Sequence, residues 1–311
     1  MARRLSALAL LAAVILAPTA CGGPLPPPDP PNLAEAKDSL SRGNYWFERG
    51  CYREAERFFK EGEISARLSD EVRLIIRSLN SQGAAALAAG NLDRAANLLA
   101  QALDLAQAQP EHPELDRILG NLAALAHRLG RPGDAEDLWR AADQAALKAK
   151  VSPATYRVSL ARLHLAAGRR DDFLALADQT LAASPAPEPL VLADVFNLAG
   201  QAASLRDNPA AAENFFRQAL ALDRQMEYTP GLAQDTEALG VLLSGGEKSG
   251  EAAGFLDRAF YLRLALGDEK GAARVLEGLK KLSVPGAPVS LEGYQAALKK
   301  PAPHRLDQRC P

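Results

Sequence analysis

The sequence predicts an all-α protein in which pairs of helices repeat along the chain. Alanine and leucine are abundant among the 311 residues, aromatic residues make up only 5%, and β-branched residues are too scarce for a sheet. Small residues recur in one register at intervals of 38 to 40 residues. Glycines between these recurring positions mark turns. These features indicate a solenoid of helical hairpins, in which each unit packs on its neighbours.

Three positions define the register of the repeat. The first holds Ala55, Ala95, Ala135, Phe173, Ala212 and Ala252. The second, twelve residues earlier, holds Gly43, Gly83, Ala123, Ala161, Gly200 and Gly240. The third, four residues after the first, is usually bulky and holds Phe59, Leu99, Trp139, Ala177, Phe216 and Leu256. We expect the small residues to let two antiparallel helices approach closely, and the bulky ones to fill the space between units.

Turn residues divide each unit into two helices. Gly50, Gly90, Gly130 and Gly168 are expected to end the first helices of units one to four. The residues expected to stop the second helices are Pro110, Pro153, Pro185, Pro230 and Pro285. Residues 267–282 fit a seventh first helix that caps the array. Residues 283–311 form a proline-rich tail, with one short helix possible at 290–299.

This pattern resembles the tetratricopeptide repeat (TPR) family over residues 36–282. The resemblance implies a right-handed solenoid of about six hairpins plus a capping helix, although the spacing exceeds the usual repeat of about 34 residues. HEAT repeats share a length of roughly 40 residues but lack this order of small positions. In TPR arrays the first helices line a concave surface that binds other proteins.

The N-terminus predicts export across a membrane. Arg3 and Arg4 precede an apolar stretch at residues 5–17, whose helix would rise about 20 Å, too short for a core of roughly 30 Å. The stretch is therefore interpreted as part of a signal peptide at 1–20. Residues 17–22, Ala-Pro-Thr-Ala-Cys-Gly, resemble a bacterial lipobox, although a proline stands where leucine is usual. The resemblance implies lipid, including palmitate, on Cys21. Ordinary cleavage nearby, giving a soluble periplasmic protein, is the alternative.

Residues 21–35 are predicted to be a linker, because residues 22–31 contain six prolines and favour polyproline II at about 3.1 Å per residue. The alternative is a disordered tail. Besides Cys21, the chain has Cys51 and Cys310. Whether these two pair is left open, since a disulfide would require the tail to fold back along the solenoid until their Cα atoms lie within about 7 Å.

Composition and motifs predict neither an enzyme nor a cofactor. The net charge of −2 argues against general nucleic-acid binding, which needs a clustered basic face. The four histidines are scattered without a second metal ligand one helical turn away. The stretch Gly245-Gly246-Glu247-Lys248-Ser249 superficially resembles a phosphate loop, but a predicted helix rather than a strand precedes it. We therefore predict no catalytic residues, no metal and no cofactor.

The resemblance places specific side chains on the concave surface. The predicted groove residues are Asn44, Phe47, Arg77, Asn80, Arg117, His127, Arg128, Arg162, Asn197 and Gln201. Arginines interspersed with amides suit an extended acidic or carboxylate-ended peptide, with Phe47 as an aromatic anchor. The five-residue carboxylate clamp of chaperone-binding TPRs is incomplete: Asn44 and Arg117 match it, whereas Leu40, Ser81 and Asn121 do not. A merely solvated inner face is the alternative.

We therefore expect a membrane-anchored TPR adaptor lipoprotein in the bacterial cell envelope, on the outer membrane and facing the periplasm. Its predicted partners are envelope proteins or extended peptide segments, with the lipid contacting the membrane and no nucleic acid involved. Similar TPR lipoproteins assist pilus secretin assembly, outer-membrane protein insertion or peptidoglycan synthesis, and the resemblance does not choose among them. A soluble periplasmic peptide-binding protein and an accessory module of an envelope enzyme complex are the alternatives.

Overall fold

The computed structural model describes residues 28–109, 113–183, 187–282, 291–299 and 310, and its regular structure there is entirely helical. The predicted signal peptide and Cys21 lie outside the described residues. The helices are α1 (Pro31–Glu48), α2 (Tyr52–Leu68), α3 (Val72–Ala88), α4 (Leu92–Gln107), α5 (Leu115–Arg128), α6 (Pro132–Lys148), α7 (Ala154–Ala166), α8 (Arg170–Leu181), α9 (Pro189–Leu205), α10 (Pro209–Gln225), α11 (Thr229–Leu243), α12 (Ser249–Ala265), α13 (Glu269–Leu282) and α14 (Leu291–Lys299). The predicted all-α fold is confirmed.

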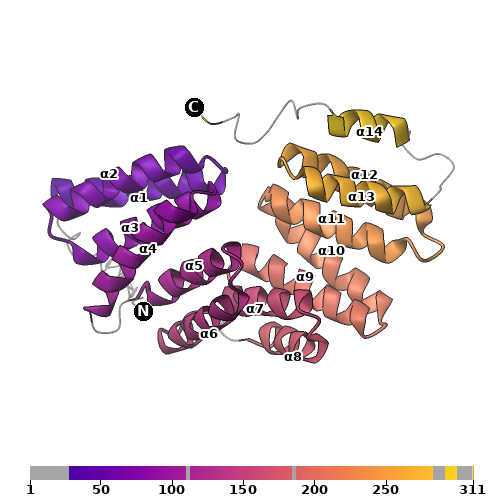
Figure 1. The fold of residues 1–311 in the computed structure, drawn as a ribbon, viewed down its shortest axis with the longest axis horizontal. Helices are drawn as coiled ribbons and strands as arrows, with labels where there is room; N and C mark the ends of the chain where they lie inside the picture. The colour runs from indigo at the N-terminus through magenta and orange to yellow at the C-terminus, as the bar shows by residue number, and fades with distance from the viewer. Residues whose placement is uncertain (1–27, 110–112, 184–186, 283–290, 300–309, 311) are drawn as a thin grey trace, which may run out of the picture.

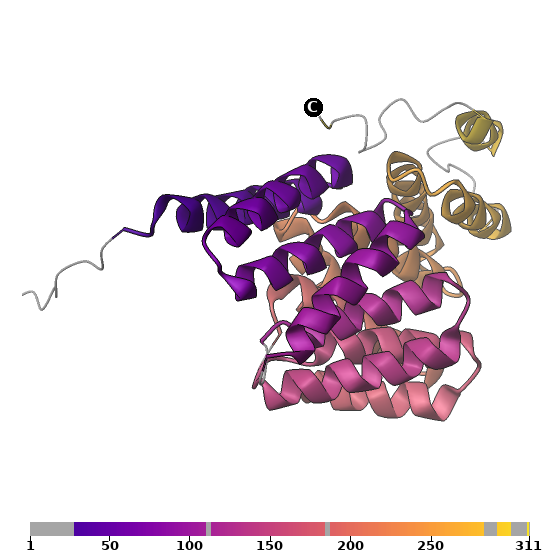
Figure 2. The same ribbon diagram turned by 60° about the vertical axis from the view of Figure 1, so that its left-hand side comes forward.

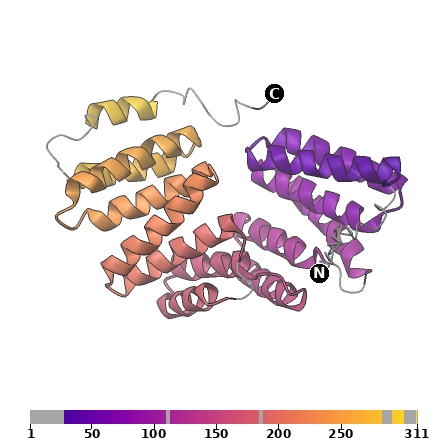
Figure 3. The same cartoon turned by 180° about the vertical axis from the view of Figure 1, so that it is seen from behind.

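The helices from α1 to α12 form six consecutive hairpins, which we number as repeats one to six. The hairpins follow a curved path, seen from opposite sides in Figures 1 and 3, with α6 and α8 outside α5 and α7. Helix α13 packs on α12 as an unpaired seventh first helix. Helix α14 packs on this end through Tyr294, whose buried ring contacts Phe260 at 4.9 Å between centroids.

The predicted register is confirmed by the contacts of four glycines. A Cβ atom at Gly43 would lie 2.3 Å from the ring of Phe59, and one at Gly200 would lie 2.5 Å from Phe216. The same relation holds for Gly83 with Leu99 (2.7 Å) and for Gly240 with Leu256 (2.6 Å). The bulky side chain thus packs within its own hairpin, against the glycine of the first helix, and not only between units. Glycine is required because any side chain would occupy the partner's volume.

Gly240→Ala is expected to destabilise the protein by about 1–3 kcal/mol through overpacking. The added methyl group would meet not only the flexible Leu256 side chain but also the Leu256 backbone nitrogen, at 3.1 Å. Gly254→Ala on the same hairpin is the matched control, because a Cβ atom there would have no neighbour within 4 Å and the site is exposed. Alanine's better helix propensity should stabilise that variant by up to about 1 kcal/mol. Equal shifts in urea midpoint for both variants would contradict the packing register.

The turn chemistry is confirmed for the first helices of repeats one to four and is wrong for two of the prolines expected to stop second helices. The four predicted glycines all have positive φ, between 72° and 83°. Second helices instead end before left-handed residues such as Lys150 (φ 58°) and Glu227 (φ 52°). Pro153 is the N-cap of α7, and Pro230 lies in the first turn of α11. These two prolines therefore begin the next helix, where the missing N–H costs no hydrogen bond. Pro110, Pro185 and Pro285 lie outside the described residues.

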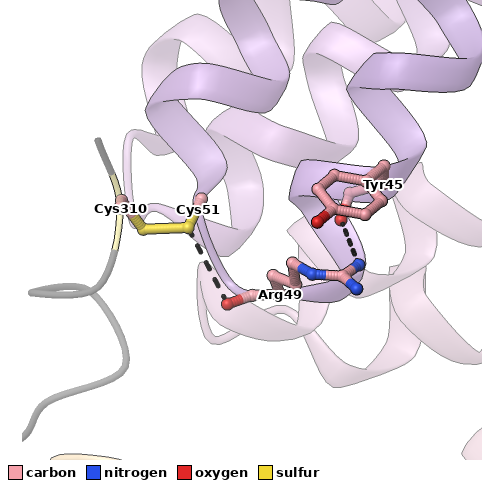
Figure 4. The surroundings of a disulfide bond; sticks show 4 residues. All are labelled: Tyr45, Arg49, Cys51 and Cys310. Carbon is pink, nitrogen blue, oxygen red and sulfur yellow. Dashed lines mark hydrogen bonds between the residues drawn. A yellow bond between two sulfur atoms is a disulfide. The ribbon is translucent and has the colours of Figure 1, made fainter.

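A disulfide joins Cys51 to Cys310, with Cα atoms 5.4 Å apart and a separation of 259 positions in the sequence. The question left open by the sequence is answered, because Cys310 lies at the turn between α1 and α2, on the side of repeat one where Figures 1 and 2 mark the C-terminus. Figure 4 shows the bond beside Arg49, whose guanidinium lies 3.6 Å from the Tyr45 ring centroid. The disulfide therefore ties the end of the chain covalently to repeat one.

Candidate functional site

The predicted groove residues lie on successive first helices but differ in how accessible they are. Asn44, Arg117, Arg128 and Arg162 are exposed, as is His127. Phe47, Arg77 and Gln201 are half-buried, whereas Asn80 and Asn197 are buried. The first helices α1, α3, α5, α7 and α9 carry all of these residues. The residues therefore lie on equivalent helices of successive repeats. The side chains packed around each of them determine whether it is accessible to a ligand.

The two buried asparagines join neighbouring repeats. Asn121 donates from Nδ2 to Asn80 Oδ1 at 2.8 Å. Asn197 donates from Nδ2 to Asp235 Oδ1 at 2.6 Å, and its own Oδ1 accepts from Gln201 and Gln234. These amides are occupied by the solenoid itself, which differs from the ligand-binding role predicted for Asn80, Asn197 and Gln201. A buried amide is retained because its hydrogen bonds are satisfied.

The predicted aromatic anchor, Phe47, belongs partly to the core. Its ring packs edge-to-face on Tyr52 at 5.4 Å between centroids, beside the buried cluster that contains Leu40 and Phe59. The more exposed aromatic residue of repeat one is Tyr45, at 49%, which was not among the predicted groove residues. The sequence feature that could have pointed to Tyr45 is its position two residues before Phe47, in a Tyr-Trp-Phe run. A substitution at Phe47 would therefore alter folding as well as the surface.

Two arginines from neighbouring repeats share one carboxylate. Arg77 Nε lies 3.8 Å from Glu114, and Arg117 Nη1 lies 3.9 Å from the same side chain. The arginine side chains are 43% and 57% exposed, and exposed pairs at such distances contribute little energy. Nearby, Arg128 reaches toward the turn at Gly90 and has no ion-pair partner among the described residues. Repeats two and three therefore present more positive than negative charge on their first helices.

Repeats four to six carry a more balanced polar surface. Arg162 is paired with Asp194, at 2.5 Å, across the joint between repeats four and five. This pairing reduces the free positive charge that the sequence assigned to Arg162. Asp194 and Gln234 were not predicted as part of this face, because polar residues are common on exposed helices. Of the arginines predicted for the groove, the ones without a close ion pair among the described residues are therefore Arg77, Arg117 and Arg128.

Buried His164 belongs to an ion-pair network rather than to a metal site. Its Nε2 lies 3.3 Å from Glu136, which accepts a bidentate pair of hydrogen bonds from Arg169. The hydrogen bonds from Arg169 and Arg140 lower the pKa of Glu136 to about 2. Glu136 is on α6, whereas His164 and Arg169 belong to repeat four. The network thus joins repeats three and four.

The remaining candidates are a metal site, a phosphate loop and a membrane span. Within the described ranges, no three or more His, Cys, Asp or Glu side chains are grouped so that they could hold a metal ion. Lys248, in the stretch that resembles a phosphate loop, contacts Glu213 at 2.9 Å. No helix in the described part of the chain is long and apolar enough to cross a membrane.

Comparison with known proteins supports the TPR resemblance. Residues 74–142 match the family model of the tetratricopeptide repeat, and the small residues of the second register position recur in all six observed hairpins. Tetratricopeptide repeats are thus shown over residues 74–142. No curated protein matches this chain significantly.

Solved structures share the solenoid fold at low sequence identity. Aspartyl phosphate phosphatase F from Bacillus subtilis superposes with a TM-score of 0.61 and 15% identity, over 89% of this chain and 72% of that chain. The Rap conjugation gene regulator of plasmid pLS20, in complex with the Phr* peptide, gives 0.59 and 16%, over 86% and 78%. Pseudomonas aeruginosa pilF gives 0.46 and 20%, over 74% and 99%. These similarities concern the fold alone.

Proposed function

We propose that this TPR protein is a lipid-anchored adaptor of the bacterial cell envelope that binds acidic segments of partner proteins on its concave face. The observation that carries the proposal is the N-terminal leader that ends in Thr19-Ala20-Cys21. Cleavage before Cys21 and acylation of its side chain and amine would supply several acyl chains, which hold a protein on a membrane far more firmly than one. The proline-rich residues that follow would separate the repeats from the lipid headgroups.

The disulfide between Cys51 and Cys310 supports an exported location. Disulfides persist in oxidising compartments such as the bacterial periplasm, whereas cytosolic thiols are kept reduced. This support is independent of the leader, because it comes from the mature part of the chain. A lipoprotein on the outer membrane that faces the periplasm is consistent with both features.

The charge on the concave face supports an acidic ligand. Arg77, Arg117 and Arg128 come from adjacent first helices, and Glu114 is the carboxylate shared by the first two. Guanidinium groups bind carboxylates through paired, charge-assisted hydrogen bonds. One structural neighbour was solved with a bound peptide, so a solenoid of similar fold has accommodated a peptide. A soluble periplasmic peptide-binding protein, or an accessory module of an envelope enzyme complex, is the alternative.

Metabolic labelling with palmitate is expected to mark the wild-type protein and to be lost in Cys21→Ala. The wild type should stay with membranes after a carbonate wash, and the variant should be released, because its acyl chains are gone. Crosslinking in intact envelopes should then identify the partners held at the membrane. Release of the unmutated protein by carbonate would contradict the anchor and favour the soluble alternative.

A further inference from the structure

Two acidic side chains are buried together at the joint between repeats five and six. Asp223 on α10 is 3% exposed, and Asp235 on α11 is 1% exposed. Each of the two groups perturbs the pKa of the other. Within the described part of the chain, Asp223 Oδ1 and Asp235 Oδ2 are buried without a hydrogen-bond partner. Two carboxylates cannot donate to each other, so a proton held between them would satisfy both of these oxygens.

The neighbouring groups hold this pair in place, and none of the described residues that most affect its pKa values supplies a positive charge. Asn197 on α9 donates to Asp235 at 2.6 Å, and its orientation is fixed because Gln201 and Gln234 both donate to its oxygen. The charged group facing the pair from α9 is Asp194, whose own cation is Arg162 on α7. Tyr228, between α10 and α11, is the other titratable neighbour, and its pKa is raised by partial burial and by the charges of Asp194 and Asp223.

The backbone of α11 is also shaped around the pair. A Cβ atom at Gly231 would lie 1.8 Å from Asp223 Oδ2, so only glycine lets this carboxyl group lie against the first turn of α11. Burying two acidic side chains does not by itself require the backbone of a neighbouring helix to lie this close to one of their carboxyl groups. The joint between α10 and α11 is therefore built around the carboxyl pair, through Gly231 on one side and Asn197 on the other.

We propose that the Asp223–Asp235 pair is a pH-sensitive joint, which holds repeats five and six together while it shares a proton and loosens α11 from α10 when both carboxyl groups ionise. Two adjacent buried carboxylates repel each other. They also lose their contacts with water, and burial of a charge without a compensating partner is costly. Because α9 and α11 are first helices, loosening this joint would change the spacing of the concave face in repeats five and six.

The direction of the pH effect follows from proton linkage. Burial raises the pKa of both Asp223 and Asp235, and the charge of Asp194 raises both further. The neighbouring Asp223 also raises the pKa of Asp235, whereas the interaction with Asp235 lowers that of Asp223 without cancelling the effect of burial. The folded state therefore binds more protons than the unfolded state above the ordinary Asp pKa of about 3.9. The stabilising contribution is complete below that value and is lost as pH rises through the folded pKa values.

Hydrogen exchange of the full chain, read by mass spectrometry at about pH 5.5 and about pH 8.5 and corrected for the intrinsic rate, tests the joint. Peptides from residues 209–243 should lose at least about tenfold protection at the higher pH, whereas peptides from α3 and α4 should not. Asp235→Asn should remove this difference, because an amide imitates the protonated carboxyl group. Equal wild-type protection at both pH values, or a uniform loss over all repeats, would overturn the proposal.

Asp116→Asn is the matched control, since Asp116 is also a buried acid on a first helix but accepts a hydrogen bond from the Tyr156 hydroxyl at 2.8 Å. It should leave the pH response of residues 209–243 unchanged. If Asp235→Asn does not fold, the proposal can still be tested on the wild-type protein by infrared spectroscopy of its carboxyl groups. A protonated-carboxyl band that persists near neutral pH supports the joint, and its absence overturns it.

Discussion

Breaking the disulfide between Cys51 and Cys310 is expected to lower the free energy of unfolding by about 2–5 kcal/mol. The bond closes a loop of 259 residues, and the entropy that a crosslink removes from the unfolded chain grows with loop length. A second reason is specific to solenoids. Each repeat contacts only its neighbours, so an array frays from its ends unless the ends are held. The bond removes this freedom from repeat one and from the end of the chain together.

The variant that isolates the bond is Cys310→Ser, because Cys310 is half-exposed whereas Cys51 is buried. A serine at position 51 would add the cost of a buried hydroxyl group to the loss of the bond. Thermal melting should fall in Cys310→Ser to the value of the reduced wild type, and reductant should not lower the variant further. Hydrogen exchange should locate the loss in α1, α2 and α14. Identical melting of the oxidised wild type and Cys310→Ser would show that the bond does not stabilise the fold.

The disulfide also marks a limit of prediction from this sequence. Whether Cys310 can reach Cys51 depends on the curvature of the whole array, which is the sum of small rotations between successive repeats. The pairing inside each hairpin is local by comparison, and Gly200 facing Phe216 could be predicted from a fixed spacing. The ends of α6 and α10 were mispredicted because the left-handed residues that follow them, Lys150 and Glu227, carry no glycine signal.

The same distinction applies to the concave face. The repeat register correctly places Asn80 and Arg77 on one first helix, three residues apart. It does not reveal that Asn121 of the next repeat bonds to Asn80, because that contact depends on how far the two helices are offset. The predicted arginines stay more accessible than most of the predicted amides, since a guanidinium can rarely be buried without a partner.

Arg77→Gln together with Arg117→Gln is expected to weaken binding of an acidic peptide at least about tenfold, or about 1.4 kcal/mol. Charge-assisted hydrogen bonds contribute about 1.5–3 kcal/mol each before desolvation is deducted. Removing two arginines should therefore reduce the free energy of peptide binding by a measurable amount. A fluorescently labelled oligo-glutamate peptide is a suitable probe, with affinity measured by anisotropy at low and at physiological salt. Wild-type affinity should fall as salt rises, because exposed charges are screened, and the variant should show a weaker salt dependence.

Arg57→Gln with Arg94→Gln is the control, because these residues lie on the second helices α2 and α4 and are similarly exposed. It removes the same charge from the whole protein, so a general electrostatic effect would weaken binding equally in both variants. Both double variants should retain the wild-type melting temperature to within a few degrees, since exposed ion pairs contribute little stability. If the control loses the peptide while Arg77→Gln with Arg117→Gln keeps it, the ligand binds the convex side. If neither variant binds more weakly, the concave arginines are a solvated surface, and the partner must be sought elsewhere on the repeats.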